Sequence, residues 1–428
     1  MSARIIEEQL LEESADKFRV KMRWWAIGFA SIASFGYFYV LDNPEVLQEE
    51  LENTYNLSNT QYNLFYTAIS LPGIFITPTM GWITRFIAIR HVWLLCLMLI
   101  IMGQAGFALG AAVEVYGLML LGRFIFGAGM SSVISLQLSI AYRWFKTDME
   151  LATAVSFGIS VGHLGSVVNN FLNPFFLKKG LSLPTILTIS LVIVVVAVII
   201  SSYFYFLDRQ YSRKLPEFGD SQHLAPTSTP NLGFGVLKQF PPLWIFLTLS
   251  ILATYCCVYN FLFIGNEYMQ IGFGYEKYYA SLLVSMPALC SLCLGPFCGA
   301  FVDRFGRRTH LLGFASCGIL TCHTLLLGSI YSPSSIVIGF AMVIFGLSYT
   351  LYSSLIWACL SMSVPEDLVI TSNGIVVSLQ TAALMLSTLL IGTIRDNSTG
   401  YATMQGFFVF LSILGVIFAF FVFKQNLK

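Results

Sequence analysis

The sequence predicts an all-α membrane protein with twelve transmembrane helices in two six-helix bundles. Three observations support this fold class: the composition, the distribution of basic residues and an internal repeat. Hydrophobic residues make up 56% of the chain and charged residues only 11%, and the mean hydropathy is +0.75. A soluble domain carries far more charge on its surface, so the composition excludes a soluble fold.

Apolar runs of about 18 residues or more, long enough to cross a bilayer as helices, recur along nearly the whole chain. Because these runs leave little room for a separate catalytic domain, the sequence predicts no enzyme activity, no cofactor and no metal site. We place the spans at 24–41, 61–83, 92–112, 115–142, 150–176, 182–206, 241–266, 278–302, 310–330, 335–362, 368–393 and 401–423.

The longest polar stretch between two spans covers 207–240 and divides the chain into two halves. It contains Pro216, Pro226 and Pro230 together with several Ser and Thr residues, a composition typical of a linker. The predicted organisation is therefore a cytoplasmic tail (1–23), a first bundle (24–206), a cytoplasmic linker (207–240) and a second bundle (241–424).

Basic residues are distributed unequally between the two sides of the membrane. The chain has 23 Lys and Arg residues, and a cytoplasmic N-terminus would place nearly all of those outside the spans in cytoplasmic segments. Cytoplasmic loops are enriched in Lys and Arg, so we expect both termini in the cytoplasm. The predicted partners are the lipid bilayer and a small-molecule solute, with no nucleic acid. The basic residues left on the opposite side are Lys178, Lys179, Lys277 and Arg395.

A short charged segment at 299–308, with the sequence GAFVDRFGRR, connects two predicted helices of the second half. The segment 80–90, MGWITRFIAIR, occupies the same place in the first half, where Thr84 replaces the acid. Gly299 allows two helices to approach closely, and Asp303 can accept hydrogen bonds from arginines or from a helix N-terminus. Alternatively, the segment is simply a basic cytoplasmic loop, which would explain its final arginines but not its Gly and Asp.

Arg123 lies within the fourth predicted span, in the segment GRFIFGAG at 122–129. A cation inside a membrane is energetically costly and marks a functional site by default. Two interpretations remain open: Arg123 takes part in gating, or it has a structural role and bonds to carbonyl oxygens of the first helix.

The patterns G-x-x-x-D-R-x-G-R-R at 299–308 and R-x-x-x-G-x-G at 123–129 resemble two motifs of the major facilitator superfamily. The resemblance implies a solute carrier built as a parallel repeat of two bundles, with its substrate site near the midplane between them. We expect the motif residues to control gating. These residues are Arg85, Arg90, Arg123, Gly299, Asp303, Arg304, Gly306 and Arg307.

Several longer segments resemble the MFSD1-like family of lysosomal carriers, whose substrates are small dipeptides. They cover 34–39, 42–48, 141–146, 165–169 and 346–366. The resemblance implies a lysosomal or endosomal membrane and a luminal glycoprotein accessory subunit. The plasma membrane stays open as an alternative location. The chain departs from the family pattern at Ser131, where the family has an acid, and at His163, where it has an arginine. Those charges would suit a zwitterion, so their loss weakens the expectation of a zwitterionic dipeptide.

Polar and aromatic residues within the spans suggest a small, mostly neutral polar solute. No Asp or Glu lies in the middle of a predicted span, which favours uniport over proton coupling. Two alternatives stay open: a proton-coupled carrier of another metabolite that uses His163, and a non-transporting membrane subunit or receptor. We also expect Pro72, Pro78 and Pro287 to mark helix breaks. The predicted substrate-binding residues are Tyr37, Ser131, Gln137, His163, Asn169, Tyr259, Asn260 and Trp357.

Overall fold

The structure is a computed structural model that describes residues 2–145, 150–214, 239–397 and 400–426. Twelve helices in these residues are long and apolar enough to cross a membrane, so the predicted number of spans is confirmed. The described residues are otherwise arranged in short helices and connecting turns, without strands.

The first half of the chain supplies six of the spans, and its second span is divided among α4, η1 and α5. The helices of this half are α1 (Ser2–Leu41), α2 (Asn43–Val46), α3 (Gln48–Tyr55), α4 (Asn59–Ile76), η1 (Thr77–Thr79), α5 (Met80–Phe86), α6 (Ile89–Ala112), α7 (Tyr116–Phe145), α8 (Leu151–Lys178) and α9 (Leu183–Arg213).

The second half supplies the other six spans, and its second span is divided between α11 and α12. The helices of this half are α10 (Pro242–Glu267), η3 (Tyr268–Gly272), α11 (Lys277–Val284), α12 (Met286–Phe305), α13 (Arg308–Tyr331), α14 (Ser335–Met362), η4 (Glu366–Leu368), α15 (Val369–Asn397) and α16 (Ala402–Asn426).

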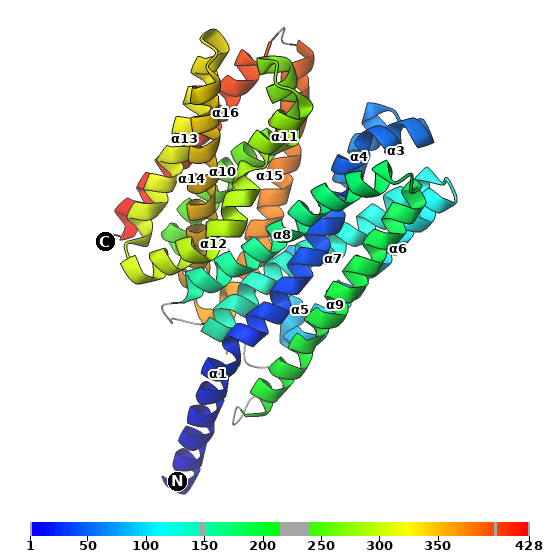
Figure 1. The fold of residues 1–428 in the computed structure, drawn as a ribbon. Helices are drawn as coiled ribbons and strands as arrows, with labels where there is room; N and C mark the ends of the chain where they lie inside the picture. Colours follow the sequence, from blue (N-terminus) through cyan, green and yellow to red (C-terminus); the bar gives the residue numbers. More distant parts are fainter. Residues whose placement is uncertain (1, 146–149, 215–238, 398–399, 427–428) are drawn as a thin grey trace.

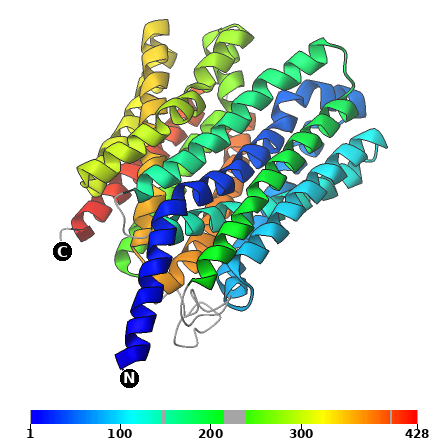
Figure 2. The same ribbon diagram turned by 60° about the horizontal axis from the view of Figure 1, so that its bottom comes forward.

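The two halves lie side by side, and both termini lie toward the same end of the spans (Figure 1; Figure 2). We call this end the terminal side. Contacts between the halves involve α8 with α12 and α14, and α15 with α4, α5 and α7. The ribbons of the two halves diverge toward the end opposite the termini (Figure 1).

The ends of the two halves differ from the predicted boundaries because the helices are longer than their apolar runs. Residues 2–23 of the predicted tail belong to α1, a helix that extends beyond the bundle (Figure 1). At the other end of the first half, α9 continues to Arg213, past the expected boundary at 206. Most of the expected linker falls outside the described residues, and the division into two bundles stays a prediction.

Prolines accompany a break in the second span of each half, as expected. Pro78 lies in the 3₁₀ segment η1 between α4 and α5. Pro287 is the second residue of α12, which follows α11 after the single residue Ser285. A proline lacks the backbone N–H that a helix interior requires. Pro72 differs from the prediction, since it lies inside the continuous helix α4.

The helices α6 and α7 pack closely because glycines line their contact. A Cβ atom placed on Gly122 of α7 would lie 2.7 Å from the backbone oxygen of Gly103 and 2.8 Å from the backbone carbon of Gly106, both on α6. Small residues at helix contacts let backbones approach in membranes, where lipid supplies no hydrophobic driving force.

We expect Gly122→Ala to lower the free energy of unfolding by about 1–3 kcal/mol, because the added methyl group would force α6 and α7 apart. Thermal unfolding of the purified protein measures the effect. Gly117→Ala is the matched control, since a Cβ at this exposed position on the same helix meets no atom within 4 Å. Equal unfolding temperatures for the two variants would contradict the prediction.

Candidate functional site

Asp303, near the end of α12, connects the two halves at the terminal side. Its carboxylate accepts hydrogen bonds from the backbone N–H groups of Ala152 (3.2 Å) and Thr153 (2.8 Å), and from the Thr153 hydroxyl (2.7 Å). These amides belong to the first turn of α8, which has no side-chain cap of its own. The first amides of a helix lack intrahelical partners and favour a negative charge, so Asp303 acts as a helix cap supplied by the other half.

The residues around Asp303 show which parts of the motif form contacts. A Cβ atom on Gly299 would lie 2.6 Å from the Cα atom of Thr153, so the close approach of α12 to α8 requires glycine there. Gly306 ends α12 in the left-handed conformation with φ of 70°, where glycine has no steric penalty. Among the motif arginines, Arg308 forms the ion pair with Asp303 at 3.1 Å.

The other two arginines of this segment, Arg304 and Arg307, are exposed. Neither forms an ion pair among the described residues. Their predicted part in gating therefore has no contact to support it in this conformation, and it stays a prediction.

The equivalent position in the first half behaves differently. The Thr84 hydroxyl donates a hydrogen bond to the backbone oxygen of Met80 on its own helix (2.8 Å). Gly81 packs against the start of α15, where an added Cβ would lie 2.7 Å from the Cα atom of Thr371. The close helix contact is therefore kept in the first half, while the acid that would cap the partner helix is missing. The side chain of Arg85 lies outside the described residues.

Asp208 on α9 provides the acid for the arginines of the first half. Its carboxylate lies 3.7 Å from the guanidinium of Arg90 and 3.4 Å from that of Arg143. Asp208 is fully buried and Arg90 is only 2% exposed. Burying charges of one sign without a counter-charge is costly, so this carboxylate stabilises the terminal end of the first bundle.

Arg123 on α7 bonds to carbonyl oxygens of the first helix, which is the structural one of its two open interpretations. Its guanidinium donates hydrogen bonds to the backbone oxygens of Val40 (3.0 Å) and Leu41 (2.9 Å), at the end of α1. The guanidinium also lies over the rings of Phe107 and Phe126, at 5.0 and 5.4 Å from their centroids. The last carbonyl groups of a helix have no N–H donor within that helix. Arg123 therefore supplies hydrogen bonds that α1 itself cannot make.

His163 on α8 lies where the two halves meet and contacts one ring from each. Its ring centroid is 5.5 Å from that of Phe38 on α1 and 6.3 Å from that of Tyr349 on α14. His163 is 7% exposed, and its Nε2 atom has no hydrogen-bond partner. A buried polar atom without a partner is a candidate contact for a bound molecule. Further ring contacts connect Phe38 to Tyr37, and Tyr349 through Tyr255 to Trp357. We call these six residues the aromatic series: Tyr37, Phe38, His163, Tyr349, Tyr255 and Trp357.

Tyr259 joins the aromatic series through side-chain contacts within the second half. Its hydroxyl accepts a hydrogen bond from the Tyr349 hydroxyl (3.4 Å), and its ring stacks on Tyr255 at 5.5 Å. The indole N–H of Trp357 donates to the Tyr255 hydroxyl at 2.7 Å. The predicted residues Tyr37, His163, Tyr259 and Trp357 are therefore brought together.

The other predicted substrate-binding residues lie apart from this series or bond to the protein itself. Gln137 accepts a hydrogen bond from a serine of α1 (2.5 Å), Asn169 donates to a backbone oxygen of α1 (2.5 Å) and Asn260 donates to a serine of α15 (2.6 Å). Ser131 packs against Gly73 of α4. Their roles in solute binding stay predictions.

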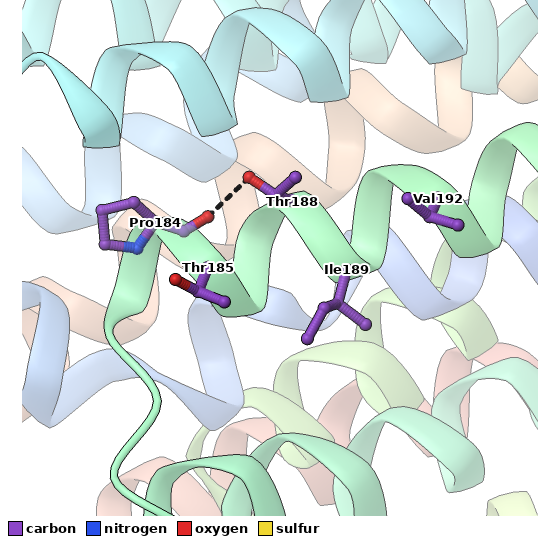
Figure 3. A pocket seen from close by; sticks show the side chains of 5 residues that line it. All are labelled: Pro184, Thr185, Thr188, Ile189 and Val192. Atoms are coloured by element: carbon purple, nitrogen blue, oxygen red, sulfur yellow. Dashed lines mark hydrogen bonds between the residues drawn. The ribbon is translucent and has the colours of Figure 1, made fainter.

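A pocket of about 280 Å³ lies on α9 near the end opposite the termini (Figure 3). All its lining residues belong to this one helix, and the Thr188 hydroxyl donates to the backbone oxygen of Pro184 at 2.7 Å. None of the predicted substrate-binding residues lines it. The residues that line it are Pro184, Thr185, Thr188, Ile189 and Val192.

Three acidic residues have charged neighbours in the structure that the sequence pattern does not predict. The predicted linker 207–240 includes Asp208, although α9 continues through it to Arg213. Asp42 and Glu45 follow the first predicted span, which ends at 41. Asp42 lies within electrostatic range of Arg123, and Glu45 lies within electrostatic range of Asp42. For Asp42 and Asp208 the available signal is a carboxylate within two residues of the end of a predicted span.

Comparison with known proteins identifies matches along almost the whole chain. The family model described as Major Facilitator Superfamily matches residues 23–388. The human protein named lysosomal dipeptide transporter MFSD1 is 28% identical, and the match covers 95% of this chain and 88% of the human one. The mouse protein of the same name is 27% identical with the same coverage.

Two solved structures show the same fold at low sequence identity. The proton:xylose symporter XylE, bound to 6-bromo-6-deoxy-D-glucose, superimposes with a TM-score of 0.78 at 15% identity, covering 95% of this chain and 96% of that one. The transporter FucP in the outward conformation superimposes with a TM-score of 0.68 at 14% identity, covering 92% and 98%.

We expect Asp208→Asn to destabilise the protein by about 3–5 kcal/mol, because two largely buried arginines would lose their counter-charge. Thermal unfolding measures the change. Glu13→Gln is the control, since Glu13 pairs with Lys17 where both side chains are more than 60% exposed, and exposed pairs contribute about 0–1 kcal/mol. An Asp208→Asn protein as stable as the control would show that the cluster has no structural role.

Proposed function

The chain belongs to the major facilitator superfamily, and on that basis we propose that it carries a small organic solute across a membrane by alternating access. The position of the hydrogen bonds between the two halves supports alternating access most directly. The described hydrogen bonds between them lie on the terminal side of His163: they join α8 to α12, α7 to α15, and α4 to α15.

Closure at one end is what alternating access requires of one of its two states. On the opposite side, a ring contact between Tyr66 on α4 and Phe263 on α10, with centroids 6.3 Å apart, connects the halves. Phe263 is 48% exposed. We propose that the solute enters past these rings, reaches His163, and leaves after the contacts of Asp303 break. The terminal side is the cytoplasmic side in this proposal.

We propose a dipeptide or similar compound as the solute, and a lysosomal or endosomal membrane as the location. Support comes from the MFSD1 proteins, which match this chain over most of their length and are named lysosomal dipeptide transporters. A luminal accessory subunit is part of the same proposal.

We propose uniport, because the two most deeply buried carboxylates already have partners. Asp208 pairs with two arginines, and Asp303 pairs with Arg308 and caps α8. Proton-coupled carriers keep a titratable group in the pathway. The unpartnered Nε2 atom of His163 favours proton coupling as the second candidate.

We expect dipeptides to raise the unfolding temperature of the purified protein in a panel that also contains amino acids, sugars and monocarboxylates. A ligand at 100 times its Kd stabilises the folded state by about 2.7 kcal/mol. His163→Phe keeps a ring but removes the Nε2 atom, and should weaken binding about ten-fold. His91→Phe, at an exposed histidine, is the control. Stabilisation by another class but not by dipeptides would refute the dipeptide proposal.

Uptake into proteoliposomes decides between the two modes of transport. A uniporter should accumulate labelled dipeptide only to equilibrium, at a level that an imposed pH gradient does not change. Accumulation that follows the gradient in the wild type and is lost in His163→Phe would establish proton coupling. An absence of uptake for every compound that binds would favour a receptor or subunit.

We expect Asp303→Asn to shift the protein toward the state that is open at the terminal side, because a neutral amide caps α8 more weakly. Charge-assisted hydrogen bonds contribute about 1.5–3 kcal/mol, equivalent to a population shift of about 10- to 150-fold. Spin labels at the exposed residues Ile87 and Phe305 report the distance between the halves. Glu366→Gln, which removes an exposed carboxylate after α14 outside the motif, is the control. An unchanged distance distribution in Asp303→Asn would contradict the prediction.

A further inference from the structure

Four aromatic side chains line the contact between α1 and α9 at the terminal side. The ring centroids of Trp25 and Phe29 on α1 lie 6.0 Å apart, and Phe29 stacks on Tyr203 of α9 at 5.7 Å. Tyr203 in turn contacts Phe206 at 6.1 Å. Trp25 is 62% exposed, and Tyr203 and Phe206 are each 55% exposed. We call these four side chains the boundary rings, because aromatic residues with exposed faces gather where a membrane meets water.

Two lysines lie on the same helix faces as the boundary rings, farther toward the ends of α1 and α9. Phe18, Lys21 and Trp25 follow one another on α1 at intervals of three and four residues, which places them on one face. Lys214, directly after α9, follows Tyr203 by about three helical turns. The ammonium group of Lys214 lies over the ring of Phe18, 5.4 Å from its centroid. The two lysines therefore flank the Phe18 ring.

Lys21 and Lys214 form no ion pair with any acidic residue in the described part of the chain. Arg23, two residues after Lys21, does have an acidic partner, Glu150, at 2.7 Å. Two cations beside one ring and without a counter-charge create a positive potential that attracts an anion. The general enrichment of basic residues in cytoplasmic segments accounts for the lysines. It does not account for exposed rings on the same faces of the same two helices.

We infer that the contact between α1 and α9 binds an anionic phospholipid, with its phosphate held by Lys21 and Lys214 and its acyl chains along the boundary rings. The predicted spans begin at 24 on α1 and end at 206 on α9, so the rings lie at the edge of the hydrocarbon region and the lysines outside it. Long lysine side chains reach the level of lipid headgroups. In the proposed orientation this is the cytoplasmic leaflet, which carries the anionic lipids. The inference holds whichever solute is carried.

Three probes test the inference on the purified full-length protein in detergent: dioctanoyl phosphatidylserine, dioctanoyl phosphatidylcholine and glycerophosphoserine. The unfolding temperature at increasing probe concentration gives an apparent Kd for each. We expect phosphatidylserine to bind about 30-fold more tightly than phosphatidylcholine, because two lysines recognise its net negative charge. Glycerophosphoserine has the same headgroup without acyl chains and should give no shift. Equal affinity for the two lipids, or binding of glycerophosphoserine as tight as that of phosphatidylserine, would overturn the inference.

Paired lysine variants locate the charge recognition. The double variant Lys21→Gln, Lys214→Gln should lose the preference for phosphatidylserine. The matched control is Lys178→Gln, Lys179→Gln, two exposed lysines at the opposite end of the spans, where the Lys179 ammonium lies over the Phe175 ring at 5.6 Å. It removes the same charge and an equivalent cation–ring contact, and should keep the full preference. The same result in both double variants would overturn the inference. The probe series on the wild type does not depend on whether these variants fold.

Phosphatidylserine with brominated acyl chains locates the apolar part of the lipid, because bromine quenches the fluorescence of a nearby indole. We expect Trp25→Phe to remove part of the quenching that the wild type shows. Trp82→Phe is the control, since Trp82 is also exposed (42%) and lies on α5, away from the boundary rings. Quenching that is unchanged in Trp25→Phe would place the acyl chains elsewhere and contradict the inference.

Discussion

The hydrogen bonds from the first turn of α8 to the carboxylate of Asp303 determine how the two halves are arranged. A helix that begins near a membrane has unsatisfied backbone N–H groups, and a partner must be found for each. For α8 that partner belongs to the other half of the chain, so the cap exists only while the halves are closed at the terminal side. Gly299 makes the contact possible, because a larger residue would hold α12 away from α8. This interaction ties the start of α8, the helix that carries His163, to the other half.

The equivalent segments 299–308 and 80–90 make different contacts, and this difference affects which contacts would break when the terminal side opens. In the second half the acid at Asp303 bridges the halves. In the first half Thr84 bonds to its own helix, and the acid comes from Asp208, which pairs with arginines of α6 and α7. All three elements of that cluster belong to the first half. The cluster therefore stabilises one bundle as a rigid unit, and opening of the terminal side would break the Asp303 contact but leave the Asp208 cluster intact.

Polar residues inside the membrane divide into those that bond to the protein and those with unused groups. Arg123, Asn169 and Asn260 each donate to other protein atoms, which is the usual solution where water is absent. His163 keeps a ring nitrogen that the protein does not satisfy. This nitrogen lies on α8 where rings from both halves, Phe38 and Tyr349, contact the imidazole. This contrast is what separates candidate solute contacts from structural hydrogen bonds.

The sequence by itself determined the number of spans, the repeat of two halves, the paired helix breaks at Pro78 and Pro287, and the importance of Gly299 and Asp303. These properties are local: span length follows from the thickness of the bilayer, and a motif keeps its spacing along the chain. Tertiary structure decided which partners the charged residues find. It selected Arg308 rather than Arg304 or Arg307 for Asp303, Asp208 for Arg90, and carbonyl oxygens for Arg123. Those choices depend on how each helix is rotated and packed against its neighbours, and hydropathy along a single chain carries no record of that rotation.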